Sequence, residues 1–197
     1  MKIGVLGGTF DPPHLGHLQL AQAAVTHLDL DEVMLMIARR NPMKATIPGA
    51  SAKQRLEMVR LAIEDHPKVS ICDLELQRDG PSYAYESMEQ LEFVKPAEYW
   101  FVLGSDAART LPQWKKVERL LRSARIAMAV RPPDTQAAAL AALPPEMRER
   151  IDPIAMPESH ISSTDIRHRI AEGKSVSAFL DPKVLQYIKK HRLYTTA

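Results

Sequence analysis

Short apolar runs alternate along the chain with stretches of helical periodicity. The runs are nearly continuous and short, as expected of strands buried on both faces of a parallel sheet. They predict strands at 3–6, 32–37, 69–76, 99–103, 125–131 and 154–156. The periodic stretches predict helices after residue 17, inside 135–150, and at 51–66, 82–94, 106–111, 114–121 and 181–188. This repetition of strand, helix and strand predicts an α/β fold with a doubly wound, mostly parallel sheet.

Capping residues support the helix start at residue 51 and predict a further helix start at residue 162. Ser51 is followed three positions later by Gln54, and Ser162 is followed in the same way by Asp165. This is the spacing of a capping box, in which the first side chain accepts a hydrogen bond from a free N–H group of the helix. We therefore expect one domain over residues 1–197, whose C-terminal part, about 162–197, is helical.

The turn between the first strand and the first helix, residues 7–17, is the strongest candidate for chemistry. Gly7 and Gly8 let the backbone approach a ligand closely, and the first N–H groups of the helix point to the same place. The turn therefore predicts an anion site. His14 and His17 lie three positions apart and would project from one side of it. Two imidazoles over a phosphate pocket indicate phosphoryl chemistry.

Other interpretations of this turn stay open from the residues alone. A glycine pair is often only a turn, and a histidine pair can bind zinc. The segment lacks the glutamate of H-E-x-x-H and Cys72 is the single thiol of the chain, so we predict no metal ligand in the protein. The spacing of Gly4, Gly7 and Gly8 also differs from the G-x-G-x-x-G of dinucleotide-binding enzymes.

Three further segments follow predicted strands and could line a ligand site. A basic loop after the second strand contains Lys44, although a solvated loop has the same composition. Gly104 and Asp106 follow the fourth strand, where the carboxylate could bind ribose hydroxyls or cap a short helix. Trp114 begins the next predicted helix, where it could be core or stack on a planar ring.

Composition and charge narrow the class of partner. Hydrophobic residues at 45% and charged residues at 25% are ordinary globular values. The net charge of +2 is too small to indicate a nucleic-acid partner, although local positive charge would suit a phosphate. The chain has no apolar run of roughly eighteen residues, and Gly7 and Gly8 interrupt the N-terminal apolar stretch early. We expect a soluble, cytoplasmic protein without a nucleic-acid or membrane partner.

Two motifs carry a resemblance to a known superfamily. Residues 7–17, G-G-T-F-D-P-P-H-L-G-H, resemble without a gap the signature of the adenylyltransferase branch of the nucleotidyltransferases. Residues 161–167, I-S-S-T-D-I-R, resemble a second motif of that superfamily. The resemblance implies a Rossmann-like fold in which the two histidines hold the ATP triphosphate and the second motif grips it from the other side. It assigns the ATP site to Gly7, Gly8, Thr9, Phe10, His14, His17, Gly104, Asp106, Arg131, Ser162, Ser163, Thr164 and Arg167.

Within that superfamily the chain is similar to the bacterial nicotinate-nucleotide adenylyltransferases, from Met1 to Tyr194. Residues 111–114 resemble the L-P-x-W of that family, and residues 82–84 fall where the family shows S-Y-T. The resemblance implies Mg²⁺-assisted adenylyl transfer from ATP to nicotinate mononucleotide, in NAD biosynthesis. It assigns the nicotinate mononucleotide site to Thr9, Lys44, Ser82, Tyr83, Ala84 and Trp114, and catalytic roles to His14, His17, Lys44 and Arg167.

Two positions depart from the family pattern. Ala84 replaces a threonine hydroxyl, which would weaken the selectivity for acid over amide if that hydroxyl matters. Met43 stands roughly where a histidine is expected beside Lys44, which removes one cation. Nicotinamide mononucleotide and phosphopantetheine therefore stay open as acceptors, and so does a nucleotide-binding sensor without catalytic activity. Both a monomer and a homodimer are compatible with the sequence.

Overall fold

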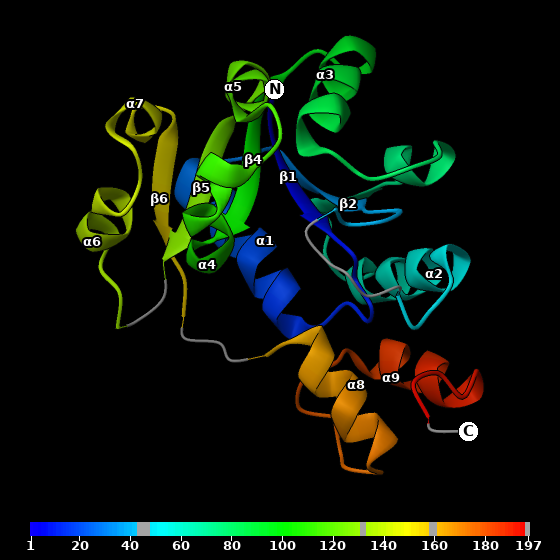
Figure 1. The fold of residues 1–197 in the computed structure, drawn as a ribbon. Coiled ribbons are helices and arrows are strands. Elements are labelled where there is room, and N and C mark those ends of the chain that lie inside the picture. The colour runs from blue at the N-terminus through cyan, green and yellow to red at the C-terminus, as the bar shows by residue number, and fades with distance from the viewer. Residues whose placement is uncertain (43–47, 131–132, 158–160, 196–197) are drawn as a thin grey trace.

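Six parallel strands form the centre of the protein (Figure 1). The computed structural model describes residues 1–42, 48–130, 133–157 and 161–195. The strands are β1 Lys2–Gly8, β2 Glu32–Ile37, β3 Val69–Cys72, β4 Glu98–Gly104, β5 Arg125–Val130 and β6 Ile151–Ala155. Their order across the sheet is β3-β2-β1-β4-β5-β6, which places β1 and β4 side by side at the centre.

Helices cover both faces of this sheet. Two of them, α1 and α2, pack on one face, and α3 and α5 pack on the other. The helices are α1 Leu15–Leu28, α2 Ala52–Ile63, α3 Ala84–Val94, α4 Ser105–Arg109, α5 Val117–Ser123, α6 Gln136–Ala141, α7 Pro145–Arg148, α8 Ser163–Ala171 and α9 Pro182–Lys190. Short 3-10 helices lie at Leu74–Gln77 and Leu111–Gln113. The α/β, doubly wound, parallel fold class predicted from the sequence is confirmed.

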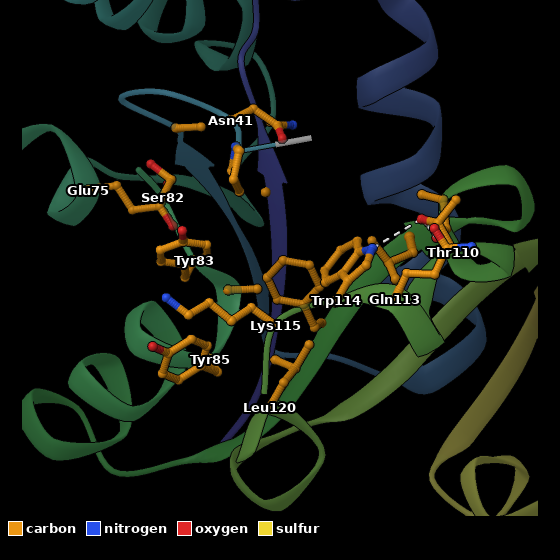
Figure 2. A pocket seen from close by; sticks show the side chains of 18 residues that line it. Asn41, Glu75, Ser82, Tyr83, Tyr85, Thr110, Gln113, Trp114, Lys115 and Leu120 are labelled. Carbon is orange, nitrogen blue, oxygen red and sulfur yellow. Dashed lines mark hydrogen bonds between the residues drawn. The ribbon is translucent and has the colours of Figure 1, made fainter. Parts of the chain in front are cut away.

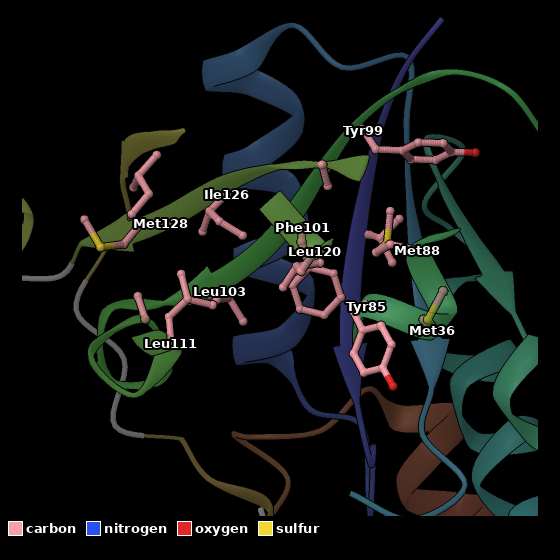
Figure 3. Packing of buried hydrophobic residues seen from close by; sticks show 14 of the residues in the cluster. Met36, Tyr85, Met88, Tyr99, Phe101, Leu103, Leu111, Leu120, Ile126 and Met128 are labelled. Atoms are coloured by element: carbon pink, nitrogen blue, oxygen red, sulfur yellow. The ribbon is translucent and has the colours of Figure 1, made fainter. Parts of the chain in front are cut away.

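The continuous apolar runs of the strands fill two cores at once. Successive side chains of a strand point to opposite faces, so Met36 of β2 joins the core under α3 while its neighbour Leu35 joins the core under α1. Figure 3 shows the first of these cores, in which Tyr85 of α3 and Leu120 of α5 pack near Phe101 of β4. Burial on both faces explains why these strands lack the polar alternation of an exposed sheet.

The strand predicted at 69–76 is wrong in its second half. After Cys72 the chain turns into the 3-10 helix Leu74–Gln77. The physical cause is Glu75, whose side chain is 5% exposed and accepts a hydrogen bond from Ser87 Oγ of α3. A buried carboxylate requires such a partner, and reaching it takes this segment away from the sheet.

The helix predicted at 114–121 begins later, as α5 at Val117. Trp114 has an extended backbone, and Lys116 takes the left-handed conformation with a φ of 51°. Residues 114–116 therefore form a link between a 3-10 helix and α5. Glycine or asparagine usually marks a left-handed residue, and neither is present here, so no residue of this segment signals the turn.

Two other boundaries differ from the predicted ones. β6 begins at Ile151, earlier than the predicted 154, and it tolerates Pro153 because β6 lies at the edge of the sheet. The helix predicted at 82–94 begins at Ala84, and its last residue, Val94, is 59% exposed instead of joining the buried face. The last residue of the strand predicted at 125–131 falls outside the described residues, and β5 is described to Val130.

The C-terminal helices form a third core against α2. Met58 of α2, Ile166 of α8 and Ile188 of α9 are buried together there. Ser162 caps α8, since its side chain accepts a hydrogen bond from the N–H of Asp165 at 3.1 Å. Figure 1 shows α8 near the start of α1, so this core positions the second sequence motif close to the first.

Candidate active site

A crevice opens where β1 and β4 end. The chain leaves β1 toward β2 on one side, while β4 leads to β5 on the other, and ligands of open α/β sheets bind at the carboxyl ends of strands at such a reversal. Gly7 and Gly8 lie at the end of β1, and Gly104 ends β4. The predicted glycine turn therefore lies at the position where the topology favours binding.

The loop after β1 is shaped by the packing of Phe10. Its side chain is 1% exposed, and its backbone is left-handed with a φ of 50°. A Cβ on Gly8 would approach the Phe10 ring to 2.8 Å, so glycine is required at this position. The Phe10 ring meets the His17 ring edge-on, with centroids 4.9 Å apart. Phe10 thus supports His17, and its side chain is directed into the core instead of the crevice.

The two histidines lie together at the start of α1. His14 is the N-cap residue, and its ring stacks on that of His17 with centroids 3.6 Å apart. The backbone N–H of His14 donates to His17 Nδ1 at 3.2 Å. A neutral ring whose Nδ1 accepts carries its proton on Nε2, so this bond makes His17 Nε2 a donor. The predicted projection of both imidazoles from one helix start is confirmed.

Asp11 fixes the rest of this loop. Its side chain is 4% exposed, and its oxygens accept hydrogen bonds from the N–H groups of Gly49 at 2.8 Å and Ala50 at 3.0 Å. The hydroxyl of Tyr194 donates to the same carboxylate at 2.8 Å. Burial and the Asp11 carboxylate raise the pKa of Tyr194 above its ordinary value, so the phenol stays a donor.

A buried arginine braces the same region from α2. Arg55 is 2% exposed, and its guanidinium donates to the carbonyl oxygens of Thr9 at 2.8 Å and Ala38 at 2.7 Å. Burial lowers the pKa of Arg55 and the nearby Asp11 carboxylate opposes that change. Arg55 therefore ties the loop after β1 to the loop after β2.

The two sequence motifs meet at this loop. Arg167 Nη1 donates to the backbone carbonyl of Asp11 at 2.8 Å, and Ser163 Oγ donates to the carbonyl of Pro12 at 2.9 Å. The N-terminus of α8 thus lies beside that of α1, which is the arrangement expected from the sequence. We call this region, formed by residues 7–17 and 162–167, the anion end of the crevice.

Other residues predicted for the ATP site have defined positions. The Thr9 hydroxyl is buried and has no hydrogen-bond partner among the described residues. Gly104, and not Asp106, is the N-cap of α4, so the alternative of Asp106 as a cap is wrong. The Asp106 side chain is 79% exposed and pairs with Arg109 at 3.4 Å.

Three of the residues singled out from the sequence, Lys44, Met43 and Arg131, lie outside the described residues. Thr164 is described and exposed on the first turn of α8, where its hydroxyl accepts a weak bond from Arg167 at 3.4 Å. The anion end therefore consists, as described, of the two helix starts and their supporting loop.

A cavity of about 470 Å³ continues from the glycine turn toward α3 and α5. Its walls are largely apolar and include four aromatic side chains, and we call it the ring end of the crevice. Figure 2 shows Tyr83, Tyr85 and Trp114 around it. Trp114 is held by a hydrogen bond from Nε1 to Thr110 Oγ1 at 3.0 Å and by an edge-on contact with Phe101, with centroids 6.0 Å apart. A concave, largely apolar space of this size suits a planar ring.

The start of α3 contributes the remaining predicted residues. Ser82, Tyr83 and Ala84 all line the ring end. The Ser82 hydroxyl accepts a hydrogen bond from the N–H of Arg39, and the N–H of Ser82 donates to the Arg40 carbonyl. The polar groups of Ser82 therefore hold the loop after β2 against α3, and the hydroxyl is engaged in this structural contact.

Within the part of the chain that the structure describes, three or more His, Cys, Asp or Glu side chains nowhere gather as a metal site would require. Asp11, the buried carboxylate of the anion end, already accepts three hydrogen bonds from the protein. None of the helices in the described ranges combines the length and the apolar character that spanning a bilayer demands.

Sequence reasoning missed the buried supports of the site. Asp11 lies inside the first motif but has no predicted role, and Arg55, Glu75 and Tyr194 belong to none of the predicted site residues. A polar residue on an amphipathic helix is usually solvated, so Arg55 carries no signal of its burial. Tyr194 can be linked to Asp11 only once the C-terminal helices are placed.

Comparisons with known proteins agree with this geometry. A family model described as cytidylyltransferase-like matches residues 5–169. A protein of Synechococcus sp. strain JA-3-3Ab, named "Probable nicotinate-nucleotide adenylyltransferase", is 40% identical over 195 residues, covering 98% of this chain and 94% of the relative. A protein of Thermus thermophilus with the same name is 41% identical over 197 residues, covering 98% of this chain and 100% of the relative.

A solved structure shares the fold. The nicotinic acid mononucleotide adenylyltransferase of Plasmodium falciparum, complexed with NaAD, superposes with a TM-score of 0.79 at 21% identity. The match covers 98% of this chain and 97% of that one. With the family match over most of the sequence and relatives near 40% identity over full length, the chain belongs to the cytidylyltransferase-like family and, within it, to the nicotinate-nucleotide adenylyltransferases.

Proposed function

We propose that this protein transfers the adenylyl group of ATP to nicotinate mononucleotide, giving nicotinate adenine dinucleotide and pyrophosphate in NAD biosynthesis. The observation that carries the proposal is that the two ends share the glycine turn. Gly7 and Gly8 belong to the anion end, where two helix starts meet, and they also line the ring end together with Trp114 and Tyr83. A polyphosphate and a pyridine nucleotide are the two substrates such a crevice would hold side by side.

The reaction requires positioning more than covalent chemistry. A phosphate oxygen of nicotinate mononucleotide attacks the α-phosphorus of ATP, and the bond to the bridging oxygen of the β-phosphate breaks as pyrophosphate leaves with the electron pair. Catalysis then consists of in-line alignment and neutralisation of charge on the phosphates. The protein needs no nucleophile for this step.

The anion end supplies donors for the polyphosphate. His17, whose Nε2 is a donor, and His14 beside it would stabilise charge that grows on the phosphates. Arg167, Ser163 and the free N–H groups at the start of α8 would hold the departing pyrophosphate. The Thr9 hydroxyl, buried without a partner among the described residues, would donate to a substrate oxygen. Lys44 would steer the attacking phosphate.

The ring end would hold the acceptor. Trp114 would stack on the pyridine ring, while the backbone at Ser82, Tyr83 and Ala84 would receive the ring carboxylate. Asp106 has an exposed carboxylate just after the end of β4, where it would bind ribose hydroxyls of the adenylyl group.

We further propose that Mg²⁺ accompanies the ATP. The described donor set fits an ion carried by phosphate oxygens and water, because Asp11 is already engaged by three donors and carboxylates do not cluster at the described anion end. Bound in this way, the ion would neutralise phosphate charge during the transfer.

One assay tests the proposal. The protein is incubated with ATP, Mg²⁺ and one acceptor at a time, and pyrophosphate release is measured. The acceptors are nicotinate mononucleotide, nicotinamide mononucleotide and phosphopantetheine. We expect nicotinate mononucleotide to give the highest kcat/KM. Tight ATP binding without product from any acceptor would instead identify a nucleotide-binding sensor. A higher kcat/KM with another acceptor would show that this acceptor, and not nicotinate mononucleotide, is the substrate.

A further inference from the structure

A lysine reaches over the ring end from the residue next to Trp114. Because residues 114–116 are not helical, Lys115 points across the cavity instead of following a helix surface. Its Nζ lies 4.2 Å from the centre of the Tyr83 ring, on the α3 side. Figure 2 shows the side chain running from Trp114 toward Tyr83. A substrate ring placed between these aromatic residues would therefore pass close to the ammonium group.

The positive charge of Lys115 is not balanced by the other charged side chain of the described cavity lining. Among the described residues two charged side chains line it, Glu75 and Lys115. Glu75 is 5% exposed, accepts a hydrogen bond from Ser87 and pairs with Arg78 at 3.9 Å, so its negative charge is balanced behind the wall. In the described ranges no carboxylate forms an ion pair with Lys115. The open side of the ring end is therefore positive.

Neighbouring cations are engaged elsewhere. Arg119 makes a two-pronged pair with Glu89, and it lies over the Tyr85 ring at 4.8 Å. Lys116 also faces Tyr85, at 5.2 Å, and does not line the cavity. Position and charge environment thus distinguish Lys115 from the other basic residues of this segment.

We propose that Lys115 is a specificity-determining residue, whose ammonium group binds the carboxylate on the pyridine ring of the acceptor and thereby selects acid over amide. The inference rests on the proposed function and adds a residue to it. A carboxylate would form a charge-assisted hydrogen bond with Nζ, whereas a neutral carboxamide would gain much less. Ala84 has no hydroxyl to offer at the α3 start, so Lys115 is the cationic donor that the described cavity presents for this selection.

The test compares the two mononucleotides in a charge-neutral variant. In Lys115→Met we expect KM for nicotinate mononucleotide to rise about 10-fold with kcat nearly unchanged, because a ground-state binding contact is lost. KM for nicotinamide mononucleotide should stay within about 2-fold, so the ratio of the two kcat/KM values should fall about 10-fold. Lys115→Arg should retain most of the ratio, and Lys115→Glu should lower it further.

Lys116→Met is the matched control, since it removes the same charge one residue away. Its acid-to-amide ratio should equal that of the unmodified protein. An unchanged ratio in Lys115→Met would overturn the proposal. So would an equal fall in Lys116→Met, because the selectivity would then depend on general charge near the crevice and not on one contact.

Calorimetric titration of each mononucleotide without ATP separates this inference from the proposed function. If the protein releases no pyrophosphate, the proposed reaction fails, yet tighter binding of the acid that disappears in Lys115→Met would still support the role of Lys115. If the protein is active but binds acid and amide equally, the reaction stands and the role of Lys115 is overturned. If it releases no pyrophosphate and binds neither mononucleotide, both fail.

Discussion

The anion end and the ring end of the crevice are built in different ways. The anion end joins segments that are far apart in the chain, through buried hydrogen bonds that converge on Asp11 from Ala50 and Tyr194, with Arg167 on its carbonyl. Most of the aromatic lining of the ring end, Tyr83, Tyr85 and Trp114, projects from two short local segments. The first end therefore depends on the whole fold, while single side chains tune the second.

The largest expected effect lies at the anion end. His17→Ala should lower kcat by about 100-fold or more, the scale of losing one preorganised stabiliser of transition-state charge. Calorimetric binding of nicotinate mononucleotide should change little, since the ring end is untouched. His27→Ala, at the far end of the same helix, is the control and should retain full turnover. Near-normal turnover in His17→Ala would contradict the role assigned to this residue.

Asp11→Asn should affect both stability and ATP use. The amide cannot satisfy the donors of Gly49, Ala50 and Tyr194 as the carboxylate does, so we expect the free energy of unfolding to fall by about 2 kcal/mol, measured by urea denaturation. KM for ATP should rise more than KM for the acceptor. Asp29→Asn, an exposed change at the far end of α1, is the control. Equal rises in both KM values would show that the two ends are not independent.

Trp114→Leu should act at the ring end alone. Loss of a stacking surface should raise KM for nicotinate mononucleotide by about 10-fold, because one stacked ring contributes about 1–3 kcal/mol. KM for ATP and the free energy of unfolding should change far less. Trp114→Phe keeps an aromatic face, so its KM for nicotinate mononucleotide should lie between that of the unmodified protein and that of Trp114→Leu. An unaltered KM in Trp114→Leu would show that the pyridine ring of the acceptor binds elsewhere.

Tyr194→Phe should give the smallest effect. One hydrogen bond to Asp11 is lost, so the free energy of unfolding should fall by about 1 kcal/mol, or Tm by about 2–4 °C. The folded pKa of Tyr194 is raised, so this contribution is complete below the unfolded pKa of about 10 and is lost as pH rises from there through the folded pKa. The difference between Tyr194→Phe and the unmodified protein should therefore shrink in strongly alkaline solution.

Tyr187→Phe provides the comparison for that measurement. Tyr187 lies on α9, and no hydrogen bond from its hydroxyl is present among the described residues. Its removal should leave Tm nearly unchanged. A fall in Tm as large as that of Tyr194→Phe would show that the Asp11 contact has no special importance.

The sequence predicts the sheet better than the supports of the site. The residues of β2 that follow Glu32 are all apolar and buried, so the residue pattern alone predicts a strand and its limits. Arg55 follows no such rule. Its burial depends on carbonyl oxygens of Thr9 and Ala38, which come together only in the assembled fold. The sequence does not predict the turn at Lys116, because lysine seldom takes positive φ.

The bond between Tyr194 and Asp11 joins two residues that are 183 positions apart in the chain. All six strands are complete by Ala155, so the sheet can assemble before residue 194 leaves the ribosome. At that stage Asp11 still lacks the phenol donor, and α9 has not docked. A nascent chain could therefore finish its sheet before the C-terminal helices close the third core and bring the last donor to Asp11.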